Sequence, residues 1–276
     1  MIDAHQHFWD LGVRDQAWIT GAMRPLRRNF GVADLRAAAP DVTATVLVQT
    51  VTVAEETPEF LALAAESDLV GAVVGWVDLT APDVGDRLQS YVDGCGGSWL
   101  RGIRHQVQGE RNPRWLCRRD VRRGLSAVSD NGLVYELLTL PHQIPAAVET
   151  ASALPSTHFV LDHCSKPPVA SGRLYPWAEN IRALALNENV SCKLSGLVTE
   201  ADWTQWTVSD LRPYFDVVLE AFGPERLMFG SDWPVCLLAA EHSEVVAAAR
   251  SLTAELSPDE QHAIFTGNAA RAYRIG

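Results

Sequence analysis

The sequence predicts a single α/β domain over residues 1–276, folded as a (β/α)8 barrel, the TIM-barrel architecture. Eight short β-rich apolar runs recur along the chain, and stretches with helical spacing lie between them. The length of 276 residues is close to the ~250 that such a barrel needs. Alternating strand and helix signals imply parallel strands, and eight units in this length favour a closed barrel over an open sheet.

The predicted strands are short runs rich in β-branched and aromatic residues. They cover residues 2–8, 44–50, 70–77, 100–107, 133–139, 158–163, 190–194 and 226–232. Helix candidates between them include residues 57–67, 119–131, 143–153, 177–187 and 210–222. The last helix begins at Ser257-Pro258-Asp259-Glu260, a capping box with proline at the first helical position, and runs to Tyr273.

Composition and charge exclude several classes of partner. Apolar residues make up 47% of the chain and charged residues 21%, as in an ordinary globular protein. The net charge of -11 would repel a nucleic acid, and the one dense basic patch, residues 118–123, is typical of a solvated helix face. We therefore expect no nucleic-acid partner.

The chain carries no signal for a membrane or for export. The first residues lack a basic segment followed by a long apolar one, and no stretch of about 18 apolar residues occurs, so we expect a cytoplasmic protein without membrane contact. The five cysteines are scattered and odd in number, which favours reduced thiols. A homo-oligomer is compatible with the sequence, because barrel helices can form subunit interfaces without a motif.

The first predicted strand carries two histidines near its carboxyl end. With the two-residue period of a strand, His5 and His7 project from one face together with Asp3. Two imidazoles on one face form a chelating pair for a metal ion. A His-X-His sequence also arises by chance, but barrel active sites lie at the carboxyl ends of strands, which favours a metal site.

Two further strand ends supply matching groups. His163 ends the sixth predicted strand and Asp232 ends the eighth. Because the first and eighth strands of a closed barrel are neighbours, these side chains should meet His5 and His7 in one pocket. Two or three histidines and a carboxylate, with a position open for water, match a catalytic zinc site. The structural alternatives are a core histidine and a turn-forming aspartate.

Other strand ends carry charges that would be costly to bury unpaired. Lys193 shares its strand face with Ser191 and Ser195, so we expect it to point into the barrel. Arg104 and His105 point to opposite sides of a regular strand. Arg104 is the first choice for the pocket, because its fork of donors can grip a carbonyl.

The remaining candidates concern substrate binding. Glu136 is either a pocket acid or the structural partner of an arginine, and Lys166 directly follows the sixth strand. Three tryptophans near strand ends can form apolar walls against a sugar, although core filling explains each of them equally well. The candidate substrate-binding set is therefore His105, Trp76, Trp9, Trp233, Glu136 and Lys166.

Taken together, five segments resemble the amidohydrolase-2 family. They are His5-Gln6-His7-Phe8-Trp9, Gly102-Ile103-Arg104-His105, Leu161-Asp162-His163, Lys193-Leu194-Ser195-Gly196 and Phe229-Gly230-Ser231-Asp232-Trp233-Pro234. Within that family the chain is most similar to bacterial sugar lactonases of the L-fucono-1,5-lactonase type, especially over residues 192–203 and 226–240. Residues 267–273 also resemble the family's closing helix.

The resemblance implies a hydrolase in which His5, His7, His163 and Asp232 occupy the family's metal and base positions. It implies one divalent metal at most, with zinc as the first choice, because Lys193 stands where a further ligand could lie. Related lactonases do not all depend on a metal, so the metal can be dispensable.

The function expected on this basis is hydrolysis of an aldonic acid lactone, either L-fucono-1,5-lactone or a related 6-deoxy, pentose or hexose lactone. Asp232 would take a proton from the attacking water and return it to the leaving ring oxygen. Arg104, Lys193 or the metal would stabilise the oxyanion, and His163 completes the catalytic set.

Three alternatives remain open from the sequence. One is a decarboxylase of the same superfamily, and another is a Schiff-base aldolase that uses Lys193. The third is a sugar-binding barrel without turnover. Ring size and sugar stereochemistry depend on loops such as residues 18–29 and 79–86, which carry no motif.

Overall fold

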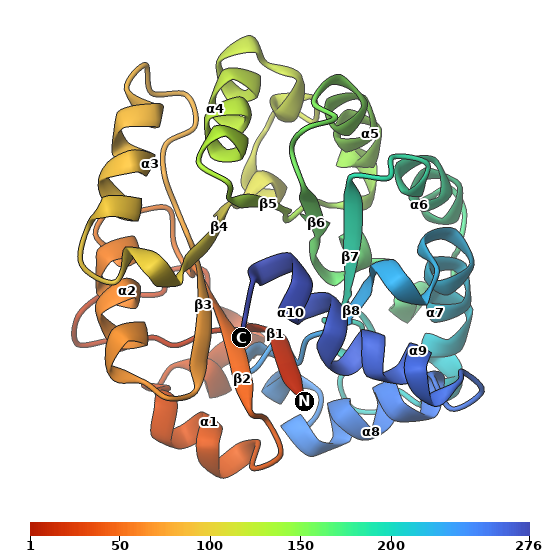
Figure 1. Ribbon diagram of the computed structural model, residues 1–276. Coiled ribbons are helices and arrows are strands. Elements are labelled where there is room, and N and C mark those ends of the chain that lie inside the picture. Colours follow the sequence, from red (N-terminus) through yellow and green to blue (C-terminus); the bar gives the residue numbers. More distant parts are fainter.

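The computed structural model describes all 276 residues, and its eight parallel strands form one sheet in the order β1 to β8 (Figure 1). The strands are β1 (Ile2–Gln6), β2 (Ala44–Val48), β3 (Val70–Gly75), β4 (Leu100–His105), β5 (Val134–Leu137), β6 (Phe159–Leu161), β7 (Val190–Leu194) and β8 (Leu227–Phe229). All eight predicted strands are confirmed. Seven of them end two or three residues earlier than predicted, because the residues at their carboxyl ends leave the sheet in loops and short turns.

The helices surround the strands in an outer ring (Figure 1). They are α1 (Val32–Ala38), α2 (Glu56–Glu66), α3 (Val84–Asp93), α4 (Arg119–Asp130), α5 (Ile144–Ala153), α6 (Trp177–Ala185), α7 (Val208–Phe222), α8 (His242–Leu252), α9 (Pro258–His262) and α10 (Asn268–Tyr273). The capping box at Ser257 is present. The predicted last helix is interrupted by a π-helical segment, Ala263–Gly267, which separates α9 from α10.

Backbone hydrogen bonds join β1 to the segment after β8. The Asp232 N–H donates to the His5 carbonyl at 2.9 Å, and the His7 N–H donates to the Trp233 carbonyl at 2.8 Å. The fold is therefore a barrel of the predicted kind. The barrel closes where β1 meets the segment after β8, and this seam contains His5, His7 and Asp232.

Apolar side chains fill the barrel beneath this seam. A cluster of 11 buried residues includes Val46, Val74 and Val160 from the strands, and Ala269 and Tyr273 from α10. In Figure 1, α10 lies across the amino-terminal ends of the strands. The amino-terminal half of the interior is thus closed by packing, which leaves the carboxyl half for polar groups.

Two further expectations concern the chain as a whole. The structure contains no helix long and apolar enough to span a bilayer. All five cysteines are free thiols, as the sequence predicts.

Candidate active site

His5 and His7 form a close pair at the carboxyl end of β1. Both side chains are buried, and their Nε2 atoms lie 3.2 Å apart. The His7 Nδ1 atom lies 2.8 Å from the Val48 carbonyl, which can only accept, so Nδ1 carries the proton. The Nε2 atom of His7 is therefore the ring nitrogen that faces the site, as in a metal-ligating histidine.

The prediction that Asp3 shares this face is wrong. Its carboxylate accepts a hydrogen bond from the Ser231 N–H at 2.8 Å and lies 3.4 Å from Nε2 of His242 on α8. The pairing of β1 with β2 shifts register between Asp3 and Gln6, which breaks the regular two-residue alternation. Asp3 consequently anchors the seam of the barrel rather than the histidine pair.

Asp232 and His163 lie just beyond the ends of β8 and β6. Both have left-handed backbone conformations, with φ of 58° and 51°. This conformation is uncommon for residues other than glycine. The Asp232 Oδ1 atom lies 3.6, 3.8 and 3.9 Å from the Nε2 atoms of His7, His5 and His163, respectively. The structure thus brings the four residues of the predicted metal and base set together.

Two glycines make this close packing possible. A Cβ atom at Gly196, where φ is +67°, would lie 2.6 Å from Nδ1 of His163. A Cβ atom at Gly230 would lie 2.7 Å from Cβ of His5. Both glycines belong to sequence motifs that contain a site residue, and they let the backbone pass directly against the histidines.

Burial sets the protonation of these groups. Desolvation lowers the pKa of His163 to about 4, and desolvation with the nearby charge of Lys193 lowers the pKa of His5 well below its usual value. Burial alone would raise the pKa of Asp232, but the neighbouring histidines hold it below its usual range. At neutral pH the imidazoles of His5 and His163 are therefore neutral, and the carboxylate of Asp232 is ionised.

The lowered pKa of His163 predicts a loss of stability in mild acid. Between its unfolded value of about 6.5 and its folded value of about 4, this histidine binds more protons in the unfolded state. Its contribution to stability is present above pH 6.5 and is lost as the pH falls to 4. We measure the unfolding free energy of the metal-free wild type and of His163→Gln in urea titrations at several pH values. The wild-type value should fall relative to that of the variant as the pH is lowered across this range. A difference that does not change with pH would contradict a neutral His163.

Beneath the histidines lies a fully buried network of charges. The Lys193 Nζ group donates to Glu136 at 2.5 Å, and it lies 3.0 Å from Nδ1 of His5 and 3.2 Å from Asp162. The Arg104 guanidinium donates to the other oxygen of Asp162 at 3.0 Å. Two cations thus compensate two carboxylates, as buried charges require.

Tyr273 of α10 completes the network from the amino-terminal side, because its hydroxyl donates to Glu136. Burial raises the pKa of Glu136 to about 7, whereas Lys193 and His5 outweigh burial and hold the pKa of Asp162 well below its usual range. Glu136 is therefore a structural partner, of a lysine rather than of the arginine suggested by the sequence. Sequence reasoning missed Asp162 and Tyr273 as site residues, although Asp162 directly precedes His163.

Above the histidines, a cavity of about 220 Å³ opens at the carboxyl ends of the strands. The predicted residues that line it are His7, Arg104, His163, Lys166 and Asp232. Trp18 and Met23 also line it, and both lie in the loop 18–29 that the sequence analysis expects to determine the substrate. The sequence did not identify the other lining residues, which are Thr50, Gln106, Gln108, Leu138 and Val235. Thr50, Gln106 and Leu138 each follow a strand by one or two residues, and that position could have revealed them.

Arg104 is held rigidly at the wall of this cavity. Its Nε donates to the Gln49 side chain at 3.0 Å, and its Nη2 donates to the Gln49 carbonyl at 2.5 Å. Lys166 lies 3.6 Å from Glu200, and both side chains are only partly buried. The cavity wall therefore contains two cations: Arg104, which is fixed by hydrogen bonds, and Lys166, which has a single partly exposed partner.

His5 lies just below the cavity wall, and six other predicted residues do not line the cavity either. The Trp76 indole donates to Nδ1 of His105 at 3.1 Å, and Nε2 of His105 contacts Glu110 at 2.9 Å. Trp9 and Trp233 both pack edge-on against Phe30, within the hydrophobic core. Lys193 and Glu136 lie in the buried network below. The structure thus separates His105, Trp76, Trp9, Trp233, Lys193 and Glu136 from the cavity-lining set, since each already contacts other protein groups.

The donor set at the top of the barrel suits a divalent cation. Ligand atoms of His5, His7 and Asp232 lie within 4.8 Å of one another, and all three residues are buried. A second group, His5, Asp162 and His163, meets the same limit. Imidazole nitrogens with a carboxylate oxygen are typical zinc ligands, and the Nε2 atom of His7 has the lone pair that a metal needs. The residues present therefore fit one divalent metal ion.

Known proteins resemble the chain over its whole length. The model of the family described as "Amidohydrolase" matches residues 2–275. Proteins named L-fucono-1,5-lactonase from Burkholderia multivorans and Burkholderia ambifaria are 41% and 36% identical, each over 99% of this chain and 96% and 95% of theirs. A crystal structure of a Burkholderia multivorans amidohydrolase with bound zinc superposes with a TM-score of 0.93 at 39% identity, covering 100% of this chain and 99% of that one.

Proposed function

The chain belongs to the amidohydrolase family, and on that premise we propose that it hydrolyses a sugar lactone, L-fucono-1,5-lactone or a related 6-deoxy, pentose or hexose lactone. The observation that carries this proposal is the ionised Asp232 carboxylate, which lies among buried imidazoles at the wall of a polar cavity that also contains Arg104. This arrangement supplies a base for water and a cation for the charge that develops on a lactone carbonyl oxygen.

The cavity suits a small polyhydroxylated ring. Gln106 and Gln108 offer amide groups on one part of its wall, while Met23 and Val235 provide apolar surface. Sugar hydroxyls bind through such polar groups, and the methyl group of a 6-deoxy sugar would bury against the apolar ones. We assign Lys166, Gln106 and Gln108 to substrate binding on this basis.

The reaction uses Asp232 first as base and then as acid. Its carboxylate takes a proton from a water molecule whose oxygen attacks the lactone carbonyl carbon, and the carbonyl electron pair moves onto oxygen. Arg104, whose orientation is fixed by Gln49 and Asp162, stabilises that oxyanion. When the ring C–O bond breaks, Asp232 returns the proton to the leaving oxygen, which gives the open hydroxy acid.

Lys193 does not contact the substrate in this mechanism. It is completely buried with Nζ 3.0 Å from Nδ1 of His5, so we assign it as a positioning residue that packs against His5. Its burial also removes the aldolase alternative from the proposal, because a Schiff base requires a substrate carbonyl to reach Nζ.

His5, His7 and Asp232 would hold the divalent metal, with zinc as the ion that this ligand set favours. A cation bound there would polarise the carbonyl and lower the pKa of water. Arg104 already lies 3.3 Å from Nε2 of His5, so the chain retains a cation in the cavity whether or not a metal is present.

Metal removal gives a direct test of the ligand set. We expect about one equivalent of zinc per chain, and we expect a chelator to lower the melting temperature, because a ligand that binds the folded state stabilises it. His7→Gln should bind zinc at least tenfold more weakly, whereas His262→Gln, a change at an exposed histidine, should not. Elemental analysis and calorimetric titration with zinc measure both effects. Equal zinc affinity in the two variants would contradict the assignment.

The function itself is tested with a panel of substrates. Aldonic 1,4- and 1,5-lactones, including 6-deoxy sugars, are incubated with the protein, and acid release is compared with the spontaneous rate. Aromatic carboxylic acids are tested in parallel for release of carbon dioxide. Rapid opening of a 6-deoxy lactone supports the proposal. Carbon dioxide release without lactone opening would favour the decarboxylase alternative, and binding without product would favour a sugar-binding protein.

A further inference from the structure

The cavity above the histidines has one side that is mainly apolar. Trp18, Met23 and Val235 line it from the loops that follow β1 and β8, which are neighbouring strands of the barrel. The short helical segments Gly21–Leu26 and Val235–Leu238 of these two loops lie against each other. The three apolar side chains therefore belong to one wall, which both loops form together.

The opposite side of the cavity is mainly polar. Gln106 and Gln108 follow β4 and Lys166 follows β6, and these strands lie across the barrel from β1 and β8. Leu138, after β5, is the one apolar residue on this side. A substrate in the cavity therefore meets hydrocarbon on one side and hydrogen-bonding groups on the other.

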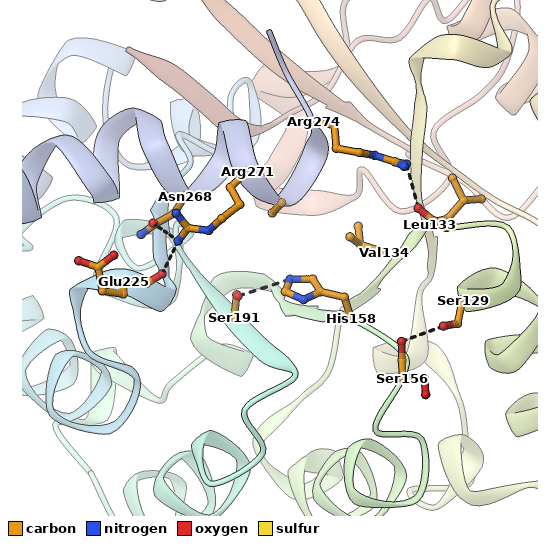
Figure 2. Close-up of a pocket in the computed structure, with 12 residues that line it drawn as sticks. Ser129, Leu133, Val134, Ser156, His158, Ser191, Glu225, Asn268, Arg271 and Arg274 are labelled. Carbon is orange, nitrogen blue, oxygen red and sulfur yellow. Dashed lines mark hydrogen bonds between the residues drawn. The ribbon is translucent and has the colours of Figure 1, made fainter.

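The charged groups of a larger cavity, at the other end of the barrel, do not converge in this way (Figure 2). This cavity measures about 430 Å³ and lies where β5, β6 and β7 begin. Arg271 donates to the Asn268 side chain at 2.7 Å on one rim, whereas Arg274 donates to the Gly132 carbonyl at 2.8 Å on the opposite rim. Volume alone therefore does not identify a site that selects its ligand.

The only polar group of the Trp18 side chain is bound outside the catalytic cavity. Its Nε1–H donates to the side-chain oxygen of Gln16 at 2.8 Å, and Gln16 is buried and does not line the cavity. The ring also packs edge-on against the buried Trp9, with 5.6 Å between the ring centroids. Because an indole has no other donor or acceptor, Trp18 offers the cavity only apolar ring surface.

The direction of this hydrogen bond is set by a buried carboxylate on α2. Glu56 accepts the Thr50 N–H at 2.8 Å and the Val51 N–H at 3.3 Å, and it also accepts the Thr50 hydroxyl. The Thr50 oxygen then accepts from the Gln16 amide NH2 at 3.0 Å, which leaves the amide oxygen of Gln16 for the Trp18 N–H. Burial raises the pKa of Glu56, and the hydrogen bonds from Thr50 and Val51 oppose this rise. Buried groups outside the cavity thus hold the indole in one orientation.

We propose that Trp18 is a specificity-determining residue, which makes the site prefer a 6-deoxy lactone over the same lactone with a hydroxyl at C6. This inference rests on the proposed lactonase function. With the carbonyl at Asp232 and Arg104 and the ring hydroxyls at the polar side, the C6 methyl is the substituent that suits the apolar wall. A C6 hydroxyl there would lose its hydration and find no partner on Trp18, because the indole N–H is bound to Gln16.

The test compares kcat/KM for L-fucono-1,5-lactone with that for L-galactono-1,5-lactone, which differs only by the hydroxyl at C6. We expect the wild type to favour the 6-deoxy lactone by about tenfold or more, which is within the discrimination that an apolar pocket can reach. In Trp18→Ala the ratio should fall to about threefold or less, because water can enter and solvate the hydroxyl. The change should come from a higher KM for the 6-deoxy lactone, with kcat nearly unchanged, since Trp18 contacts no reacting group.

Three further variants separate the effect of the apolar ring from that of its hydrogen bond and from general destabilisation. Trp18→Phe keeps an apolar ring and should keep most of the preference. Gln16→Met frees the indole N–H, which can then pair with the C6 hydroxyl, so the preference should fall by about threefold or more. Trp99→Ala removes a partly buried tryptophan just before β4, at the other end of the barrel, and should keep the wild-type ratio.

The outcomes for this inference and for the proposed function are distinguishable. A wild-type ratio near one, or the same ratio in Trp18→Ala as in the wild type, would overturn the inference while leaving the lactonase function intact. An equal loss of preference in Trp99→Ala would reduce the effect to general destabilisation and overturn it as well. An unchanged ratio in Gln16→Met would overturn the role of the hydrogen bond. Failure of the wild type to open any lactone would instead overturn the proposed function, and this inference with it.

Discussion

Replacing Asp232 with asparagine is expected to lower kcat/KM for a sugar lactone by about 10³-fold or more, with little change in fold. General base catalysis contributes roughly 10²–10⁴ in rate, and an amide of the same shape cannot take the proton from water. The side chain is buried and lies 3.6 Å from Nε2 of His7, so the substitution preserves packing while removing the charge. Acid release from the lactone measures the rate, and circular dichroism verifies the fold.

Asp216→Asn is the matched control, because it makes the same chemical change at an exposed position on α7. It should retain the wild-type rate. If Asp232→Asn were folded and also retained a rate near that of wild type, Asp232 would not be the base, and the mechanism would have to be reassigned to another group of the cavity.

Replacing Lys193 with methionine is expected to reduce the free energy of unfolding by about 3–5 kcal/mol, as is typical when one partner of a buried ion pair is removed. The change would leave Glu136 and Asp162 buried without the ammonium that lies 2.5 and 3.2 Å from their oxygens. Denaturation in urea measures the loss, and kcat should fall as well, because His5 would lose the neighbour that lies 3.0 Å from its Nδ1.

The double variant Lys193→Met/Glu136→Gln distinguishes two causes of the lost stability. One is a buried carboxylate left without its cation, and the other is poor packing of the new methionine. With Glu136 neutral, fewer buried charges lack a partner, so we expect the double variant to be more stable than Lys193→Met alone. A double-mutant cycle measures this coupling. Strictly additive losses would contradict the role of Lys193 as the counterion of Glu136.

The barrel and the meeting of His5, His7, His163 and Asp232 follow from simple physical rules. Parallel strands joined by crossovers end at one face, so polar residues at their carboxyl ends converge even when they are far apart in sequence. The error at Asp3 has an equally specific cause, because strand alternation applies only while the register is regular. The irregular pairing of β1 with β2 is a tertiary feature that the sequence does not display.

The buried network was harder to predict, because it depends on contacts between distant elements. Tyr273 reaches Glu136 across 137 positions of sequence, and only the path of α10 beneath the barrel brings them together. Trp9 and Trp233 illustrate the converse case: they lie near strand ends, yet their rings pack into the core. Proximity to a strand end therefore does not by itself place a side chain in the cavity.

The most direct test of the account is the rate at which the purified protein opens L-fucono-1,5-lactone, measured by acid release against the spontaneous reaction. The account predicts kcat/KM in the range of about 10⁴–10⁸ M⁻¹s⁻¹ that enzymes reach with their own substrates, and a loss of that rate in Asp232→Asn. A rate no faster than the spontaneous opening, for this and every related 6-deoxy, pentose and hexose lactone, would contradict it.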